Sequence, residues 1–77
     1  MLNKRCQLNQ ALEWITKAVE MRPDAFWMSR QKSLIQAELG DKKGALESAK
    51  VSLAASEKAG NADYIKMNQE SISEWSK

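Results

Sequence analysis

Few side chains in this 77-residue sequence could carry out chemistry. The chain has no histidine, one cysteine and three aspartates, so a zinc or iron site and a histidine-based catalytic triad lack the residues they need. Glu70 and Glu74 are the closest pair of carboxylates, but they lie on a polar helix face away from any pocket-forming loop. Cys6 follows Arg5 and could be a reactive thiol or an incidental cysteine. We therefore expect no catalytic residue, no metal and no cofactor.

Charged residues are numerous but dispersed. Twelve basic and ten acidic side chains give a net charge of +2, and the basic pairs at 4–5 and 42–43 are too small for a nucleic-acid footprint. No apolar stretch approaches the ~20 residues that span a bilayer, and no apolar segment of a signal peptide follows the N-terminal cations. We expect a soluble protein with no nucleic-acid partner and no membrane span. It would be cytoplasmic by default, and periplasmic or exported if the chain is an excised domain.

Three breaks divide the chain into four segments. They fall at residues 23–24 (Pro-Asp), 40–41 (Gly-Asp) and 60–61 (Gly-Asn), and between them helix-forming residues dominate while β-branched residues form no run. Residues 1–7 show no persuasive pattern. The sequence predicts an all-α fold with one domain over residues 8–77, in which four helices stack as antiparallel hairpins. The alternative is a plain up-down helical bundle. The predicted helices span about 8–21, 24–39, 41–59 and 61–76.

The residues at these breaks predict how the helices begin and end. Asp24, Asp41 and Asn61 have side chains that accept hydrogen bonds from the first free amides of a helix. Gly40 and Gly60 suit the left-handed conformation that often closes one. We therefore expect a side-chain cap at the start of the second, third and fourth helices.

Periodicity predicts which helix faces pack. The third segment carries a strip of small side chains, which would let two helices approach closely or would follow from the helix propensity of alanine alone. The strip consists of Gly44, Ala45, Ser48, Ala49, Ser52 and Ala55. In the fourth segment Ile65, Asn68, Ile72 and Trp75 share one stripe, so we expect this helix to cap the domain.

An internal repeat aligns residues 11–13 with residues 45–47, both Ala-Leu-Glu, at an offset of 34 positions. That period is the length of one tetratricopeptide repeat. The small, apolar, alanine and proline positions of the family's second helix correspond here to Ala11, Ile15, Ala18 and Pro23. The chain therefore resembles the tetratricopeptide repeat family over residues 8–59, although the first-helix pattern of that family is not matched in residues 24–39. It is also similar to the helical C-terminal segments of exported bacterial domains of unknown function.

The resemblance implies a superhelix with a concave groove for a protein or peptide. The groove positions of the second segment would be Trp27, Arg30, Leu34, Ala37 and Glu38. Arg30 could pair with a peptide carboxylate or be an ordinary solvated arginine. Trp14, Trp27 and Trp75 could supply core area or, for the first two, join a partner surface.

We therefore expect a non-catalytic module that binds a protein or peptide of unknown identity. The candidate partner-binding residues are Trp27, Arg30, Leu34, Glu38 and Trp14. The alternative is a structural accessory or oligomerisation domain of a larger protein, with possible self-association and no peptide ligand.

Overall fold

A computed structural model describes residues 4–77, with side chains from Cys6 onward. These residues fold into four α-helices and contain no strand: α1 (Lys4–Met21), α2 (Phe26–Glu38), α3 (Lys42–Ala59) and α4 (Ala62–Trp75). The predicted all-α class with four helices is confirmed. Of the unpatterned segment 1–7, residues 1–3 lie outside the described part of the chain.

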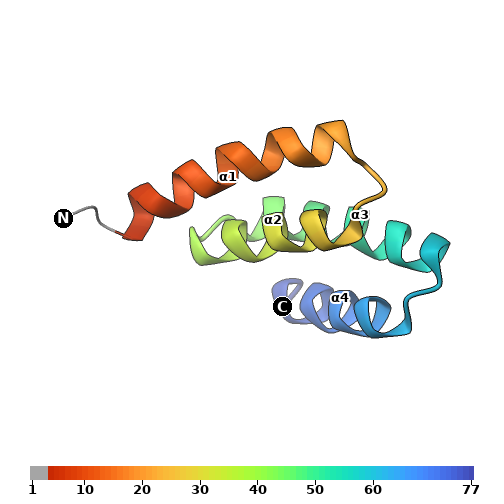
Figure 1. Cartoon of the computed structure of the whole chain (residues 1–77). Coiled ribbons are helices and arrows are strands. Elements are labelled where there is room, and N and C mark those ends of the chain that lie inside the picture. Colours follow the sequence, from red (N-terminus) through yellow and green to blue (C-terminus); the bar gives the residue numbers. More distant parts are fainter. Residues whose placement is uncertain (1–3) are drawn as a thin grey trace.

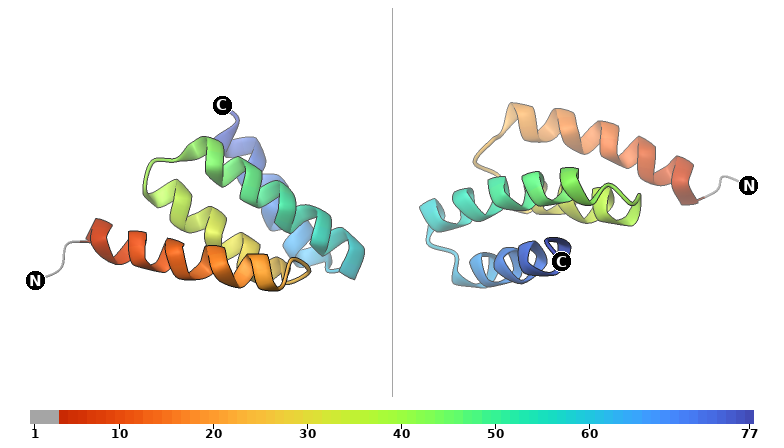
Figure 2. Two further views of the ribbon diagram at one scale, coloured as in Figure 1. Left: turned by 90° about the horizontal axis from the view of Figure 1, so that it is seen from above. Right: turned by 180° about the vertical axis from the view of Figure 1, so that it is seen from behind.

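Successive helices run antiparallel, and α2 and α3 form the central pair (Figure 1). α4 packs against α3 and, less extensively, against α2, whereas no Cα atom of α1 lies within 8 Å of α3 or α4. Figure 2 shows the same arrangement from above and from behind, with α1 lying across the α2 side of the pair. α1 therefore packs mainly against α2, and its large side chains Trp14 and Met21 stay exposed.

Two predicted helix starts are wrong. α1 begins at Lys4 rather than near residue 8, because Lys, Arg and Gln are good helix formers and an exposed first turn needs no apolar periodicity. α2 begins at Phe26, and its N-cap is Ala25 without a side-chain hydrogen bond. The amide of Phe26 donates to the backbone carbonyl of Asp24 at 2.9 Å. This tight turn moves Asp24 out of the capping position, so the predicted Asp24 cap is absent.

The other predicted helix ends are confirmed. The Asp41 side chain accepts a hydrogen bond from the amide of Gly44 at 3.0 Å, and the Asn61 side chain accepts one from the amide of Tyr64 at 3.2 Å. Gly40 follows α2 with a φ of 86°, and Gly60 closes α3 with a φ of 73°. Both angles lie in the left-handed region, where a side chain would be strained.

Small and polar side chains fill the centre of the domain. The buried apolar residues are Ile15, Ala25, Ile35, Ala45 and Ala49, and the buried polar ones are Ser29, Ser33, Ser48, Ser52, Ser56 and Asn68. Much of the small-residue strip predicted on α3 is therefore buried, in the helix that packs most extensively against α2. Small side chains allow the two helix axes to approach closely.

The buried hydroxyls are mostly hydrogen-bonded inside the domain. Ser33 Oγ donates to the carbonyl of Arg30 at 2.6 Å, and Ser52 Oγ donates across the helix interface to the carbonyl of Phe26 at 2.7 Å. Ser29 Oγ differs, because it has no hydrogen-bond partner among the described residues. The packing of α2 on α3 thus depends on shape and hydrogen bonds more than on large apolar side chains.

Candidate functional site

Most of the sequence-predicted site residues lie on the surface. Trp27, Leu34 and Glu38 are exposed on α2, and their spacing of seven and four residues places them on one helix face. Trp14 is exposed on α1, with 66% of its surface accessible. Trp75, by contrast, is half-buried on the inner stripe of α4 with Ile65 and Ile72.

Arg30 is not an ordinary solvated arginine. Its side chain is half-buried, and one guanidinium nitrogen donates to Asn68 Oδ1 at 3.0 Å and to Ser71 Oγ at 3.2 Å, both on α4. The guanidinium therefore joins α2 to α4. Arg30 therefore differs from the exposed residues of α2. Replacing it would remove hydrogen bonds to α4 and destabilise the fold.

Asn68 is the centre of this polar network and has no exposed surface. Its Nδ2 donates to Ser52 Oγ at 2.8 Å, with a longer contact of 3.5 Å to Ser56 Oγ. A fully buried amide with several partners fixes how α4 is placed on α3, since any sliding of the helix would leave polar atoms unpaired. The periodic stripe of α4 includes Asn68, but periodicity alone does not reveal this role.

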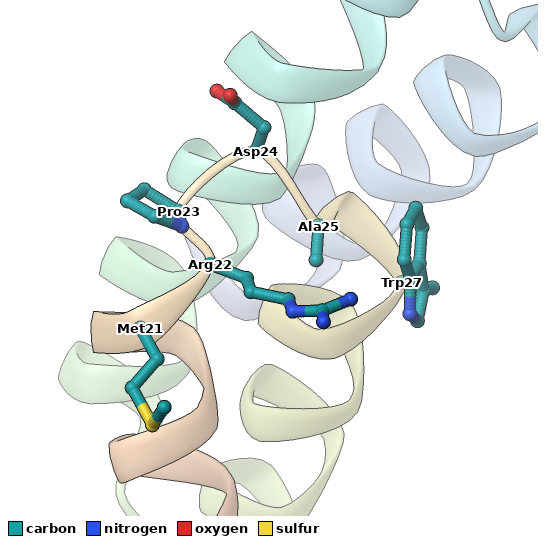
Figure 3. A pocket seen from close by; sticks show the side chains of 6 residues that line it. All are labelled: Met21, Arg22, Pro23, Asp24, Ala25 and Trp27. Atoms are coloured by element: carbon teal, nitrogen blue, oxygen red, sulfur yellow. The ribbon is translucent and has the colours of Figure 1, made fainter.

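A pocket of about 350 Å³ lies at the turn between α1 and α2. Met21, Arg22, Pro23, Asp24, Ala25 and Trp27 line it (Figure 3). Met21 and Trp27 remain 82% and 49% exposed. The pocket is therefore bordered by two large apolar side chains that the fold leaves open to solvent.

The ring of Phe26 packs against Trp27. Phe26 meets Trp27 edge to face with ring centroids 5.0 Å apart, and it meets Tyr64 of α4 in a similar way at 4.8 Å. Such pairs contribute about 0.5–1.5 kcal/mol beyond the area that they bury. The indole thus contacts a ring that also packs against α4, and it borders the pocket.

The pocket is lined by one residue from each of two exposed apolar pairs. Trp14 and Met21 are seven residues apart on α1, and Trp27 and Leu34 are seven residues apart on α2, so each pair shares a helix face. We call Trp14, Met21, Trp27 and Leu34 the exposed apolar strip. The sequence analysis identified Trp14, Trp27 and Leu34 but not Met21. The seven-residue spacing from Trp14 could have placed Met21 on the same helix face.

A second hollow, of about 580 Å³, lies on α4 and is lined by Asp63, Tyr64, Lys66, Met67 and Glu70. Three of these five side chains are charged, and only Met67 is a large exposed aliphatic residue. Tyr64 and Met67 supply its apolar surface, and the charges around it are of both signs.

Over residues 4–77, no group of three histidine, cysteine, aspartate or glutamate side chains is arranged to hold a metal ion. None of the helices described is long and apolar enough to cross a membrane. No protein-family model matches the chain, and comparisons with curated proteins and with solved structures find no match.

Proposed function

We propose that this domain is a non-catalytic interaction module that binds a protein or peptide through the exposed apolar strip. The observation that carries the proposal is the pocket between Met21 and Trp27, where two large apolar side chains remain open to water. Exposed apolar surface of this kind is typical of interaction sites. Tryptophan is also enriched among the residues that dominate binding energies.

The resemblance of residues 8–59 to tetratricopeptide repeats supports the part of this proposal that concerns α2. In such an arrangement α1 and α3 would be second helices of successive repeats, and α2 would be a first helix facing the groove. The exposure of Trp27, Leu34 and Glu38 on one face of α2 is consistent with this role. Arg30 takes part in holding α4 instead, so we omit it from the proposed contact surface.

Selection from a displayed peptide library tests the proposal. Met21→Ser is the main variant, because Met21 is highly exposed and its loss should leave the fold intact. Selected peptides should bind the parent chain and lose about fivefold or more in affinity on Met21→Ser, which corresponds to roughly 1 kcal/mol for a buried methionine contact. Val51→Ser is the matched control, because Val51 is an exposed apolar residue on α3, outside the strip.

Two results would contradict the proposal. One is a library that yields no peptide specific for the folded chain. The other is a set of peptides whose affinity falls equally on Met21→Ser and Val51→Ser, which would place binding outside the strip.

The second candidate is an oligomerisation domain, favoured by the exposure of Trp14 on a helix that contacts α2 alone. A second copy could cover that side of α1. Sedimentation equilibrium separates the two candidates: a dimer that is lost in Trp14→Ser favours self-association, and a monomer at all concentrations excludes it.

A further inference from the structure

We infer that the pocket at the α1–α2 turn accepts a bulky apolar side chain of a partner peptide, and that Arg22 binds an acidic side chain next to it. The inference rests on the proposed interaction function and names the chemistry of the partner. It depends on the size of the pocket, its apolar border and the unpaired cation beside it.

The pocket has room for one or two peptide side chains. Its volume of about 350 Å³ falls within the range of roughly 300–1,000 Å³ that encloses small organic ligands. Met21, Pro23, Ala25 and Trp27 provide an apolar lining. A bulky apolar group entering the pocket would cover Met21 and Trp27, whose exposure to water is unfavourable.

Arg22 is the cation available for recognition. Among the residues whose side chains are described, none forms a hydrogen bond or ion pair with its guanidinium. Figure 3 shows this guanidinium extending across the pocket toward Trp27, while the carboxylate of Asp24 points away on the far side of the turn. The pocket therefore combines apolar side chains with a guanidinium that forms no ion pair with the described residues.

A carboxylate is the group that best complements this arrangement. The planar guanidinium of arginine forms paired hydrogen bonds with a carboxylate. An apolar side chain bound in the pocket would exclude some of the water around the pair and strengthen the attraction. Because Arg22 and Trp27 border the same pocket, the acid and the apolar side chain must be close together in the partner, as in adjacent residues of a peptide.

A peptide fits this surface better than a small molecule does. The exposed apolar strip continues from the pocket along two helices, reaching Trp14 on α1 and Leu34 on α2. Seven residues of helix cover about 10 Å, so residues flanking the anchor would find further apolar contacts on either side.

The test uses three synthetic peptides with blocked ends, so that the only carboxylate is a side chain. The probe is Ser-Gly-Phe-Glu-Ser-Gly, and its controls replace Glu by Gln or Phe by Ala. Titrations are followed by the NMR signals of the Trp27 indole N–H and the Met21 methyl group. The Phe-Glu peptide should bind about fivefold more tightly than the Phe-Gln peptide, which corresponds to roughly 1 kcal/mol, and the Ala-Glu peptide should bind more weakly still.

Two variants assign the effect. Arg22→Gln should bind the Phe-Glu and Phe-Gln peptides equally. Lys17→Gln, which removes an exposed cation of α1 that does not line the pocket, should preserve the difference. Both side chains are exposed, so neither change should unfold the domain.

Several outcomes would overturn the inference. They are equal binding of the Phe-Glu and Phe-Gln peptides by the parent, a preference that survives in Arg22→Gln, and the absence of any shift at Trp27. A dimer that dissociates in Arg22→Gln would also overturn it, because the pocket would then hold a second copy of the chain.

The library selection distinguishes this inference from the proposed function. Peptides that depend on Met21 but show no preference for an acidic residue would support the proposed function and refute the role of Arg22. An absence of Met21-dependent peptides would refute both.

Discussion

Replacing Asn68 by alanine should greatly lower the free energy of unfolding of the domain. The change removes hydrogen bonds of 2.8 Å to Ser52 and 3.0 Å from Arg30, together with the long contact to Ser56. An ordinary buried hydrogen bond contributes about 1 kcal/mol, and one with a charged partner about 1.5–3 kcal/mol. For the hydrogen bond from Arg30 the lower value of about 1.5 kcal/mol applies, because the Arg30 side chain is only half-buried.

The net loss is then roughly 2–3 kcal/mol. Loss of the hydrogen bonds to Ser52 and from Arg30, together with the small cavity, should lower the free energy of unfolding by about 3 kcal/mol. The higher helix propensity of alanine should raise it by about 0.6 kcal/mol. A 77-residue domain has a total stability of only about 4–12 kcal/mol at 0.05–0.15 kcal/mol per residue. At about 4–8 °C per kcal/mol, Tm should fall by roughly 10–20 °C.

Urea and thermal unfolding, followed by circular dichroism, measure this effect. Gln69→Ala is the matched control, because Gln69 is the next residue of α4, carries the same amide group and is exposed. That variant should stay within about 0.5 kcal/mol of the parent. If Asn68→Ala and Gln69→Ala have the same stability at an unchanged m-value, the polar network does not hold α4, and the reasoning is refuted.

Three further predictions concern the helix ends and α4. Asp41→Ala should lower the free energy of unfolding in urea by about 1 kcal/mol, whereas Asp24→Ala should change it by about a few tenths of a kcal/mol. Of these two aspartates, only Asp41 caps a helix. Equal losses in the two variants would contradict this difference. Gly40→Ala should lower the free energy of unfolding by about 1 kcal/mol in the same assay, because the φ of 86° at this position is unfavourable for alanine. A steric clash does not contribute, since nothing lies within 4 Å of the added Cβ. Trp75→Ala should lower Tm by at least 5 °C through loss of half-buried apolar area; a monomeric variant that melts within a degree or two of the parent would show that α4 does not cap the domain.

Local signals predict much of the fold. The glycines at 40 and 60 and the caps Asp41 and Asn61 act within one helical turn, so short stretches of sequence are enough to place these boundaries. Asp24 shows the limit of that reasoning. A capping residue type is present, but the backbone turn after Pro23 decides which residue stands at the N-cap.

Long-range contacts explain what the sequence does not predict. Arg30 and Asn68 are 38 positions apart, and their hydrogen bond exists only because α4 docks beside α2. The exposure of Met21 has a similar origin, since it depends on α1 having no neighbour except α2. Residue types indicate that Trp14 and Trp27 are large and apolar, but only the packing determines that both stay open to solvent.

Phe26 connects the two parts of the molecule that matter most for these proposals. Its carbonyl accepts the hydrogen bond from Ser52, and its ring contacts both Trp27 at the pocket and Tyr64 on α4. A substitution at Trp27 would therefore remove part of the proposed contact surface and also the ring that packs against Phe26. Met21 is more than four-fifths exposed and lies on α1, whose backbone does not approach that of α4. Binding and stability can consequently be separated at Met21, whereas at Trp27 a loss of affinity has two causes that only an unfolding measurement can distinguish.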